Sequence, residues 1–257
     1  MPSPAAEDTP PLTPSFDLAG KRVVVVGGKK GIGLGVAQAA QAMGAAVVVA
    51  SRRSVSAEER SDLAAFDQVV LDIRDEAAVR DAFEDIGPFD HLVVTAGPEL
   101  GSWGSFMDTD MRGVRGYLEG KFLGSWACAR HAAPHLRVGG SITLLTGGTA
   151  ARAKLGLAAV TSTFAAVESL SQSLALELAP TRVNTIRPGF IDTDFWDVLP
   201  ADSLEEIRAK VRANFPARRL GTAADVGHAA VFLMTNPYVT GTVLEVSGGE
   251  LLVDWIF

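Results

Sequence analysis

The chain has 257 residues, 47% of them hydrophobic and 21% charged, which suits one α/β domain with a full core and excludes a disordered protein. Its net charge of −7 argues against a nucleic-acid or anionic-membrane partner, because both need a basic surface. The single cysteine, Cys128, excludes an intramolecular disulfide, no Cys and His residues have metal-ligand spacing, and no apolar run reaches the ~20 residues that span a bilayer.

The first segment in chain order, residues 1–17, is rich in Pro, Ala, Ser and Thr. It lacks the basic start and the apolar centre of a signal peptide. We expect a flexible tail on a cytoplasmic protein, followed by one domain over residues 18–257.

The most informative segment follows the first strand. The β-branched run Val23–Val26 leads into Gly27-Gly28-Lys29-Lys30-Gly31-Ile32-Gly33, and an apolar helical pattern begins at Leu34. Glycines permit the tight turn and the close approach of a pyrophosphate, which the N–H groups of the first helical turn then face. The segment predicts dinucleotide binding at Gly27, Lys29, Lys30, Gly31, Ile32 and Gly33.

Apolar runs and helical patterns alternate along the rest of the chain, as expected for buried parallel strands joined by crossover helices. They predict an α/β fold, a Rossmann-type doubly wound parallel sheet of about seven strands with helices on both faces, in a single domain. Residues 190–219 show no clear strand and are predicted to form a substrate loop beyond the carboxyl ends of the strands. The predicted strands are Arg22–Val26, Ala46–Ala50, Gln68–Leu71, His91–Thr95, Ser141–Thr146, Arg182–Ile186 and Thr242–Val246.

The end of the second strand indicates which dinucleotide is bound. A free ribose 2′-hydroxyl is usually held there by an acidic residue, but this chain has Ser51 followed by Arg52 and Arg53. Guanidinium groups suit a phosphate, so these residues favour NADP(H), although solvated surface charges would give the same pattern. Asp72, after the third strand, is placed to bond the adenine amino group.

Several motifs resemble those of the short-chain dehydrogenase/reductase family. Besides the glycine turn, they are Thr95-Ala96-Gly97, Arg187-Pro188-Gly189 and the closing strand up to Gly249, and the resemblance extends from Leu18 to Val253. It implies that the cofactor also contacts Ala96, Gly97, Pro188, Gly189, Ile191 and Thr193. In the family, the backbone near Ile191 and the hydroxyl of Thr193 would hold the nicotinamide carboxamide.

The residues that carry the family's chemistry have no counterparts in the alignment. The family uses a Ser, a Tyr-x-x-x-Lys motif and a supporting Asn. Here Gly147 aligns with the Ser, Val160 with the Tyr, Phe164 with the Lys and Lys121 with the Asn. The chain is therefore interpreted as a divergent member without the catalytic tetrad.

Four residues are candidates for replacing the missing groups. Lys121 could act as the acid, and Tyr117 lies one helical turn earlier on the same helix face. Thr146 and Thr149 flank the missing Ser and could orient a carbonyl. Ordinary roles remain open for all four: a solvated or paired lysine, core or interface packing for Tyr117, and strand propensity for the threonines.

Two further expectations follow. The chain is predicted to be an NADP(H)-dependent oxidoreductase acting on a small, apolar carbonyl or imine substrate, with a non-redox isomerase or cyclase, or a non-catalytic NADP(H)-binding protein, as alternatives. The helical patterns over 112–135 and 160–178 are apolar on more than one face, and the resemblance implies that such helices pair in a homodimer or homotetramer.

Overall fold

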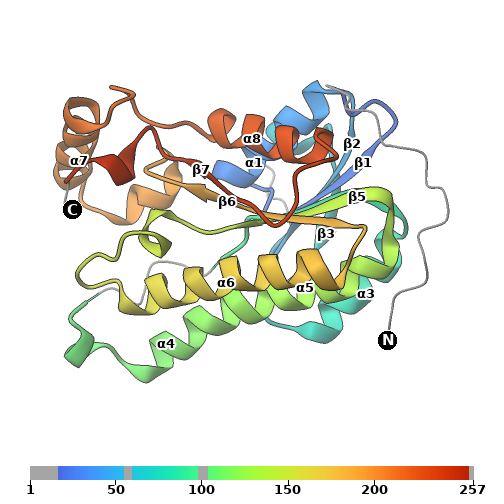
Figure 1. Ribbon diagram of the computed structural model, residues 1–257, viewed down its shortest axis with the longest axis horizontal. Helices are drawn as coiled ribbons and strands as arrows, with labels where there is room; N and C mark the ends of the chain where they lie inside the picture. The colour runs from blue at the N-terminus through green and yellow to red at the C-terminus, as the bar shows by residue number, and fades with distance from the viewer. Residues whose placement is uncertain (1–16, 55–59, 98–103, 255–257) are drawn as a thin grey trace.

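The computed structural model describes residues 17–54, 60–97 and 104–254, so the predicted tail lies almost entirely outside the described residues. Its centre is a seven-stranded parallel sheet with the strand order β3-β2-β1-β4-β5-β6-β7. This arrangement confirms the predicted doubly wound fold (Figure 1). The strands are β1 (Arg22–Val26), β2 (Ala46–Ser51), β3 (Asp67–Val70), β4 (Phe89–Val94), β5 (Leu136–Leu145), β6 (Arg182–Pro188) and β7 (Val243–Val246).

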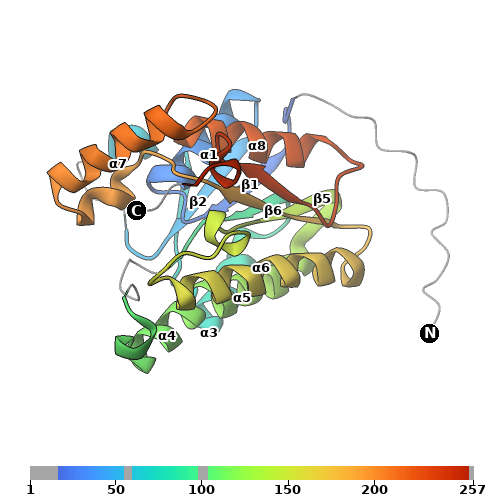
Figure 2. The same ribbon diagram turned by 60° about the vertical axis from the view of Figure 1, so that its left-hand side comes forward.

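Helices cover both faces of the sheet, because the central strands are apolar on both sides (Figure 2). On one face, α1 (Gly31–Ala42) packs against α8 (Ala223–Thr235). The other face carries α3 (Glu76–Ile86), α5 (Gly124–Ala132) and α6 (Ala158–Glu177). Each face therefore has its own core, and the sheet separates the two cores.

The helical pattern over 112–135 is not one continuous α-helix. It consists of α4 (Met111–Leu118), a π-helical stretch (Glu119–Leu123) and α5, closed by a short 3₁₀ turn. Such π-helical stretches change the phase of side chains along a helix and occur often at functional sites. Gly124 follows directly, and a Cβ there would lie 2.7 Å from Ile73 Cδ1, so close packing beneath this helix depends on glycine.

The predicted substrate loop over 190–219 has more regular structure than its sequence suggested. It contains a 3₁₀ turn (Asp194–Val198) and the helix α7 (Ala201–Asn214). Leu204, Ile207 and Val211 repeat at helical spacing and build a small core of their own with Phe190 and Phe215. A four-residue helix, α2 (Arg60–Leu63), lies before β3.

The strand order reverses between β1 and β4, which lie side by side although two strands separate them in sequence. At such a switch point, the loops after the two strands diverge and leave a crevice at the carboxyl edge of the sheet. The glycine turn follows β1, and Thr95–Gly97 follow β4. The fold therefore places both predicted cofactor motifs on this crevice.

Candidate active site and dinucleotide cleft

A cleft of about 910 Å³ opens at this edge of the sheet. Every residue that the sequence predicted for the cofactor or for chemistry lines it. The residues come from the ends of β1, β2, β4, β5 and β6 and from the helices α4 and α6. The fold thus brings both sets of residues together, while their individual roles remain predictions.

The glycine turn forms a cradle that side chains would fill. Gly27 and Gly31 have left-handed backbones, with φ of +88° and +54°. A Cβ on Gly33 would lie 2.1 Å from the carbonyl oxygen of Gly27, which no larger residue can accommodate. At the start of α1, the described residues supply no side-chain cap for the helix. Its first N–H groups are therefore free of side-chain caps and suited to donate hydrogen bonds to phosphate oxygens.

Cations gather at the end of β2. The Ser51 hydroxyl donates to the Arg53 carbonyl oxygen at 2.8 Å and shapes the turn that carries Arg52 and Arg53, both exposed on the cleft wall. Lys29 reaches the same wall and donates from Nζ to the Ser54 carbonyl oxygen at 3.2 Å. This end of the cleft is basic although the chain as a whole is acidic.

Two further charged groups of the cofactor prediction are already paired. Lys30 Nζ lies 3.0 Å from Asp194 Oδ2, and this ion pair joins the glycine turn to the segment after β6. Both carboxylate oxygens of Asp72 accept from Arg74, at 3.0 and 2.6 Å, and this bonding lowers the pKa of Asp72. Sequence reasoning overlooked Arg74, which also lines the cleft.

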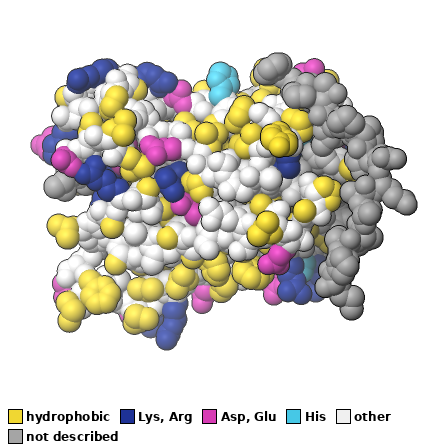
Figure 3. Space-filling view, in the orientation of Figure 1, with side chains coloured by type: hydrophobic (Ala, Val, Ile, Leu, Met, Phe, Trp, Pro, Cys, Tyr) yellow, Lys and Arg dark blue, Asp and Glu magenta, His cyan; other side chains and the backbone are white. Residues whose placement is uncertain are grey.

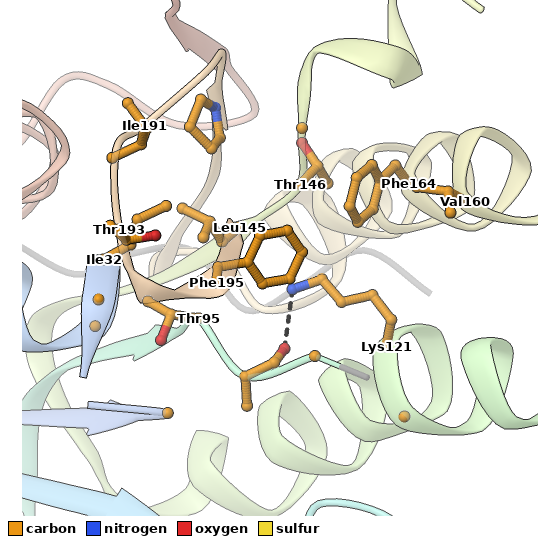
Figure 4. Close-up of a pocket in the computed structure, with 18 of the residues that line it drawn as sticks. Ile32, Thr95, Lys121, Leu145, Thr146, Val160, Phe164, Ile191, Thr193 and Phe195 are labelled. Carbon is orange, nitrogen blue, oxygen red and sulfur yellow. Dashed lines mark hydrogen bonds between the residues drawn. The ribbon is translucent and has the colours of Figure 1, made fainter. Parts of the chain in front are cut away.

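Lys121 projects into the other end of the cleft from the π-helical stretch (Figure 4). Its side chain is 3% exposed, and Nζ donates to the Ala96 carbonyl oxygen at 3.0 Å. Burial lowers the pKa of Lys121 to about 8, because the charged ammonium loses its hydration. Lys121 is therefore not a solvated lysine, and among the described residues its partner is a backbone carbonyl rather than a carboxylate.

Tyr117 and Lys121 have different surroundings, although helical spacing predicted a shared face. The Tyr117 ring packs edge-on against Phe164, with 6.2 Å between centroids, in a small cluster with Leu157 and Val160. Burial raises the pKa of this phenol above its ordinary value. The π-helical stretch begins between the two residues and shifts the phase of the helix, so the simple i,i+4 rule does not hold there.

The two threonines also differ. Thr146 donates its hydroxyl hydrogen to Glu168 at 2.9 Å, and Glu168 holds Arg187 through two hydrogen bonds of 2.9 and 2.6 Å. The Thr146 hydroxyl hydrogen is therefore already used in a hydrogen bond and is not available to a bound molecule. The Thr149 hydroxyl is buried without a hydrogen-bond partner among the described residues. Thr149 is thus the better placed of the two to donate to a bound molecule.

The positions aligned with the family's Ser and Lys are in direct steric contact. A Cβ on Gly147 would lie 2.7 Å from Cε2 of Phe164. The Phe164 ring therefore fills the space that a side chain at 147 would need, and Val160 adds a second apolar side chain beside it. Together with Leu145 and Phe195, these groups make the end of the cleft that contains Lys121 largely apolar.

This contact predicts that Gly147→Ser destabilises the protein by about 1–3 kcal/mol, the usual cost of overpacking a filled site. Gly147→Ser should cost less when the Phe164 ring is absent. The double variant Gly147→Ser with Phe164→Ala is therefore compared with Phe164→Ala alone. Gly116→Ser is the control, because a Cβ at Gly116 meets nothing within 4 Å. Urea unfolding measures all four variants, and equal midpoints for Gly147→Ser and Gly116→Ser would contradict the steric contact.

One pair of charged residues on the cleft was not found from the sequence. Lys154 Nζ lies 2.7 Å from Glu250 Oε1, and Oε2 of the same carboxylate accepts from the Phe190 N–H at 3.0 Å. Glu250 fits only because Gly189 lacks a side chain, since a Cβ there would lie 2.6 Å from Oε2. The partners are 96 residues apart, and neither belongs to a periodic pattern, so no local signal joins them.

Within the described residues, no group of three or more His, Cys, Asp or Glu side chains could hold a metal ion. Nor does any helix there combine the length and hydrophobicity that crossing a bilayer requires.

The fold and the cleft define a class: a doubly wound α/β protein with a phosphate-binding cradle at the switch point of its sheet. A family model described as enoyl-(acyl carrier protein) reductase matches residues 26–250. The short-chain dehydrogenase/reductase ucsE of an Acremonium species is 31% identical over 90% of this chain and 96% of its own length. The chain therefore belongs to the short-chain dehydrogenase/reductase family.

Two other relatives are similar over nearly the whole domain. The L-fucose dehydrogenase of Oryctolagus cuniculus is 35% identical over 91% of this chain and 86% of its own length. A solved small-chain dehydrogenase in complex with NADPH is also 35% identical, covers 91% of this chain and 99% of its own, and superposes with a TM-score of 0.82.

Proposed function

We propose that the protein is an NADP(H)-dependent oxidoreductase that acts on a small, apolar carbonyl or imine compound without the family's catalytic tetrad. The observation that carries this proposal is the continuity of the cleft. A basic end with Arg52 and Arg53 leads past the glycine cradle to an apolar end where Lys121 lies. A solved relative that binds NADPH supports the choice of dinucleotide.

The residues present fit the dinucleotide. Gly27, Gly31 and Gly33 leave room for the pyrophosphate, and the start of α1 supplies N–H donors. Arg52 and Arg53 would hold the 2′-phosphate, and Ile191 and Thr193 would hold the carboxamide. When bound, NADP(H) supplies or accepts a hydride.

The protein's own contribution to carbonyl reduction is a proton donor. Phe164 and Val160 cannot donate a proton, the Thr146 hydroxyl is bonded to Glu168, and Tyr117 lies in an apolar cluster. The Lys121 ammonium has N–H groups besides the one that bonds the Ala96 carbonyl oxygen and can donate one of them to a substrate oxygen, and Thr149 can add a second hydrogen bond. The apolar walls favour substrates with a hydrocarbon body.

A cationic C=N substrate needs no such donor, because hydride addition leaves a neutral amine. The test is therefore a panel of ketones and cyclic iminium ions assayed with NADPH by loss of its absorbance, alongside calorimetric titration of the cofactor. Turnover of either class supports the proposal. Tight cofactor binding with no turnover of the panel would instead favour the binding-only alternative, and turnover without absorbance change a non-redox enzyme.

We also propose a homodimer or homotetramer that pairs the α4–α5 helices and α6 with their copies. Leu123 and Trp126 are 53% and 47% exposed, and Leu176 on α6 is 83% exposed. Figure 3 shows apolar side chains along the margin formed by α4 and α6. Isolated large apolar side chains are common on surfaces, but several of them along neighbouring helices favour association.

Assembly through these helices predicts that Trp126→Glu shifts the protein towards monomer at micromolar concentration, measured by light scattering. The control is Met43→Glu, an apolar side chain that is 37% exposed at the end of α1, on the opposite face of the sheet. A wild-type monomer, or equal masses for the wild type and Trp126→Glu, would overturn the proposed interface.

A cytoplasmic location remains a prediction of the sequence.

A further inference from the structure

Lys121 has the surroundings of a nucleophilic amine. Its side chain is buried among apolar groups, with Val160, Phe164 and Phe195 on the same cleft (Figure 4). Its Nζ nevertheless lies on the wall of a cavity large enough for a small organic molecule. The amine is therefore shielded from bulk water but reachable from the cleft.

The hydrogen bonding of Lys121 differs from that of the second lysine on the cleft. Lys154 forms an ion pair with the Glu250 carboxylate at 2.7 Å. Lys121 has no carboxylate partner among the described residues and donates to a neutral acceptor, the Ala96 carbonyl oxygen. Burial without a counter-charge gives the amine a larger neutral fraction than an ordinary lysine has, and the neutral form carries the lone pair that a nucleophile needs.

We propose that Lys121 forms a Schiff base with small aldehydes and ketones that enter the apolar end of the cleft. The amine nitrogen adds to the carbonyl carbon, and one of its protons moves to the oxygen. A second proton, supplied by the solvent through the open cleft, lets the oxygen leave as water. The product is a protonated imine, whose remaining N–H can still donate to the Ala96 carbonyl oxygen. No oxidant or reductant is consumed.

The walls of the cavity define the class of compound. Val160, Phe164 and Leu157 offer apolar contact and no donor for a polar chain, so a short aliphatic or aromatic carbonyl compound fits best. The lowered pKa of Lys121 supports the proposal, because more of the amine is neutral near pH 7.5 than for an ordinary lysine.

This activity goes beyond the proposed hydride transfer and does not depend on it. The experiment therefore contains no dinucleotide. The wild-type protein is incubated with butanal and sodium cyanoborohydride at pH 7.5, which converts an imine into a stable N-butyl lysine. Peptide mass spectrometry then follows the modification of each lysine with time.

We expect Lys121 to be modified at least ~10-fold faster than the exposed Lys210, the gain expected from a larger neutral fraction. Lys154 should remain the least modified, because it lies on the same cleft but is ion-paired. Lys121→Arg, which keeps the positive charge, should lose the fast phase while the other lysines are unchanged.

Modification of Lys121 no faster than that of Lys210 would overturn the proposal, and so would equal modification of Lys121 and Lys154. These comparisons are made within the wild-type protein and do not depend on whether a variant folds. A failure here leaves the oxidoreductase proposal intact, since that proposal is decided by oxidation of NADPH in a separate assay.

Discussion

Lys121→Met is expected to lower kcat/KM for ketone reduction by about 10²–10⁴-fold, the usual contribution of a positioned general acid. Methionine has a similar length and suits the buried site, but it cannot donate a proton. NADP(H) affinity should change little, because the cradle and the cationic end of the cleft are intact. Steady-state kinetics with NADPH, together with calorimetric titration of the cofactor, measures both quantities.

The pH profile gives an independent test of the same role. The acid is the ammonium form, and burial lowers the pKa of Lys121 to about 8. Ketone reduction should therefore be level below about pH 8 and fall about tenfold per unit above it. Its titratable neighbours stay neutral over this range, since burial raises the pKa of Cys128 to about 12 and that of Tyr117 above its ordinary value.

Lys21→Met is the control for charge removal, because Lys21 precedes β1 at the opposite edge of the sheet and its side chain is 48% exposed. Its kinetics should match those of the wild type. Reduction of iminium ions should survive Lys121→Met, because that reaction needs no acid. Brisk ketone reduction by Lys121→Met would assign the proton to another group, with Tyr117 the next candidate.

Arg52→Ala is expected to reduce the preference for NADP(H) over NAD(H) by about 10–150-fold, which corresponds to the ~1.5–3 kcal/mol of a charge-assisted phosphate contact. The effect should fall mainly on NADP(H), because only that cofactor carries the 2′-phosphate. Dissociation constants of both dinucleotides, measured by titration for wild type and variant, give the ratio directly.

Arg130→Ala supplies the matched control, as an exposed arginine on α5 that does not line the cleft. Its cofactor preference should equal that of the wild type. A similar loss of affinity for NADP(H) and NAD(H) in Arg52→Ala would mean that Arg52 acts as a general cation, and an unchanged ratio would remove it from the phosphate site.

The sequence by itself determined the fold and the location of the cleft. Continuous β-branched runs such as Val23–Val26 can be buried only when a sheet is covered on both faces, and the glycines after them allow the tight turn and the close approach of a pyrophosphate. These are local constraints, carried by neighbouring residues. The helix α7 was not predicted because residues 190–219 were judged by their lack of a clear strand, although Leu204, Ile207 and Val211 have helical spacing.

Only the tertiary structure decided which polar groups are available for chemistry. Thr146 and Thr149 are alike in sequence, but Glu168 binds one hydroxyl while the other has no partner among the described residues. The Lys154–Glu250 pair and the contact of Phe164 with Gly147 likewise join residues from different elements. Burial and hydrogen bonding depend on what the rest of the chain places nearby. For that reason the sequence could name Lys121 as a candidate, while only the fold gave it an apolar site and a neutral hydrogen-bond acceptor.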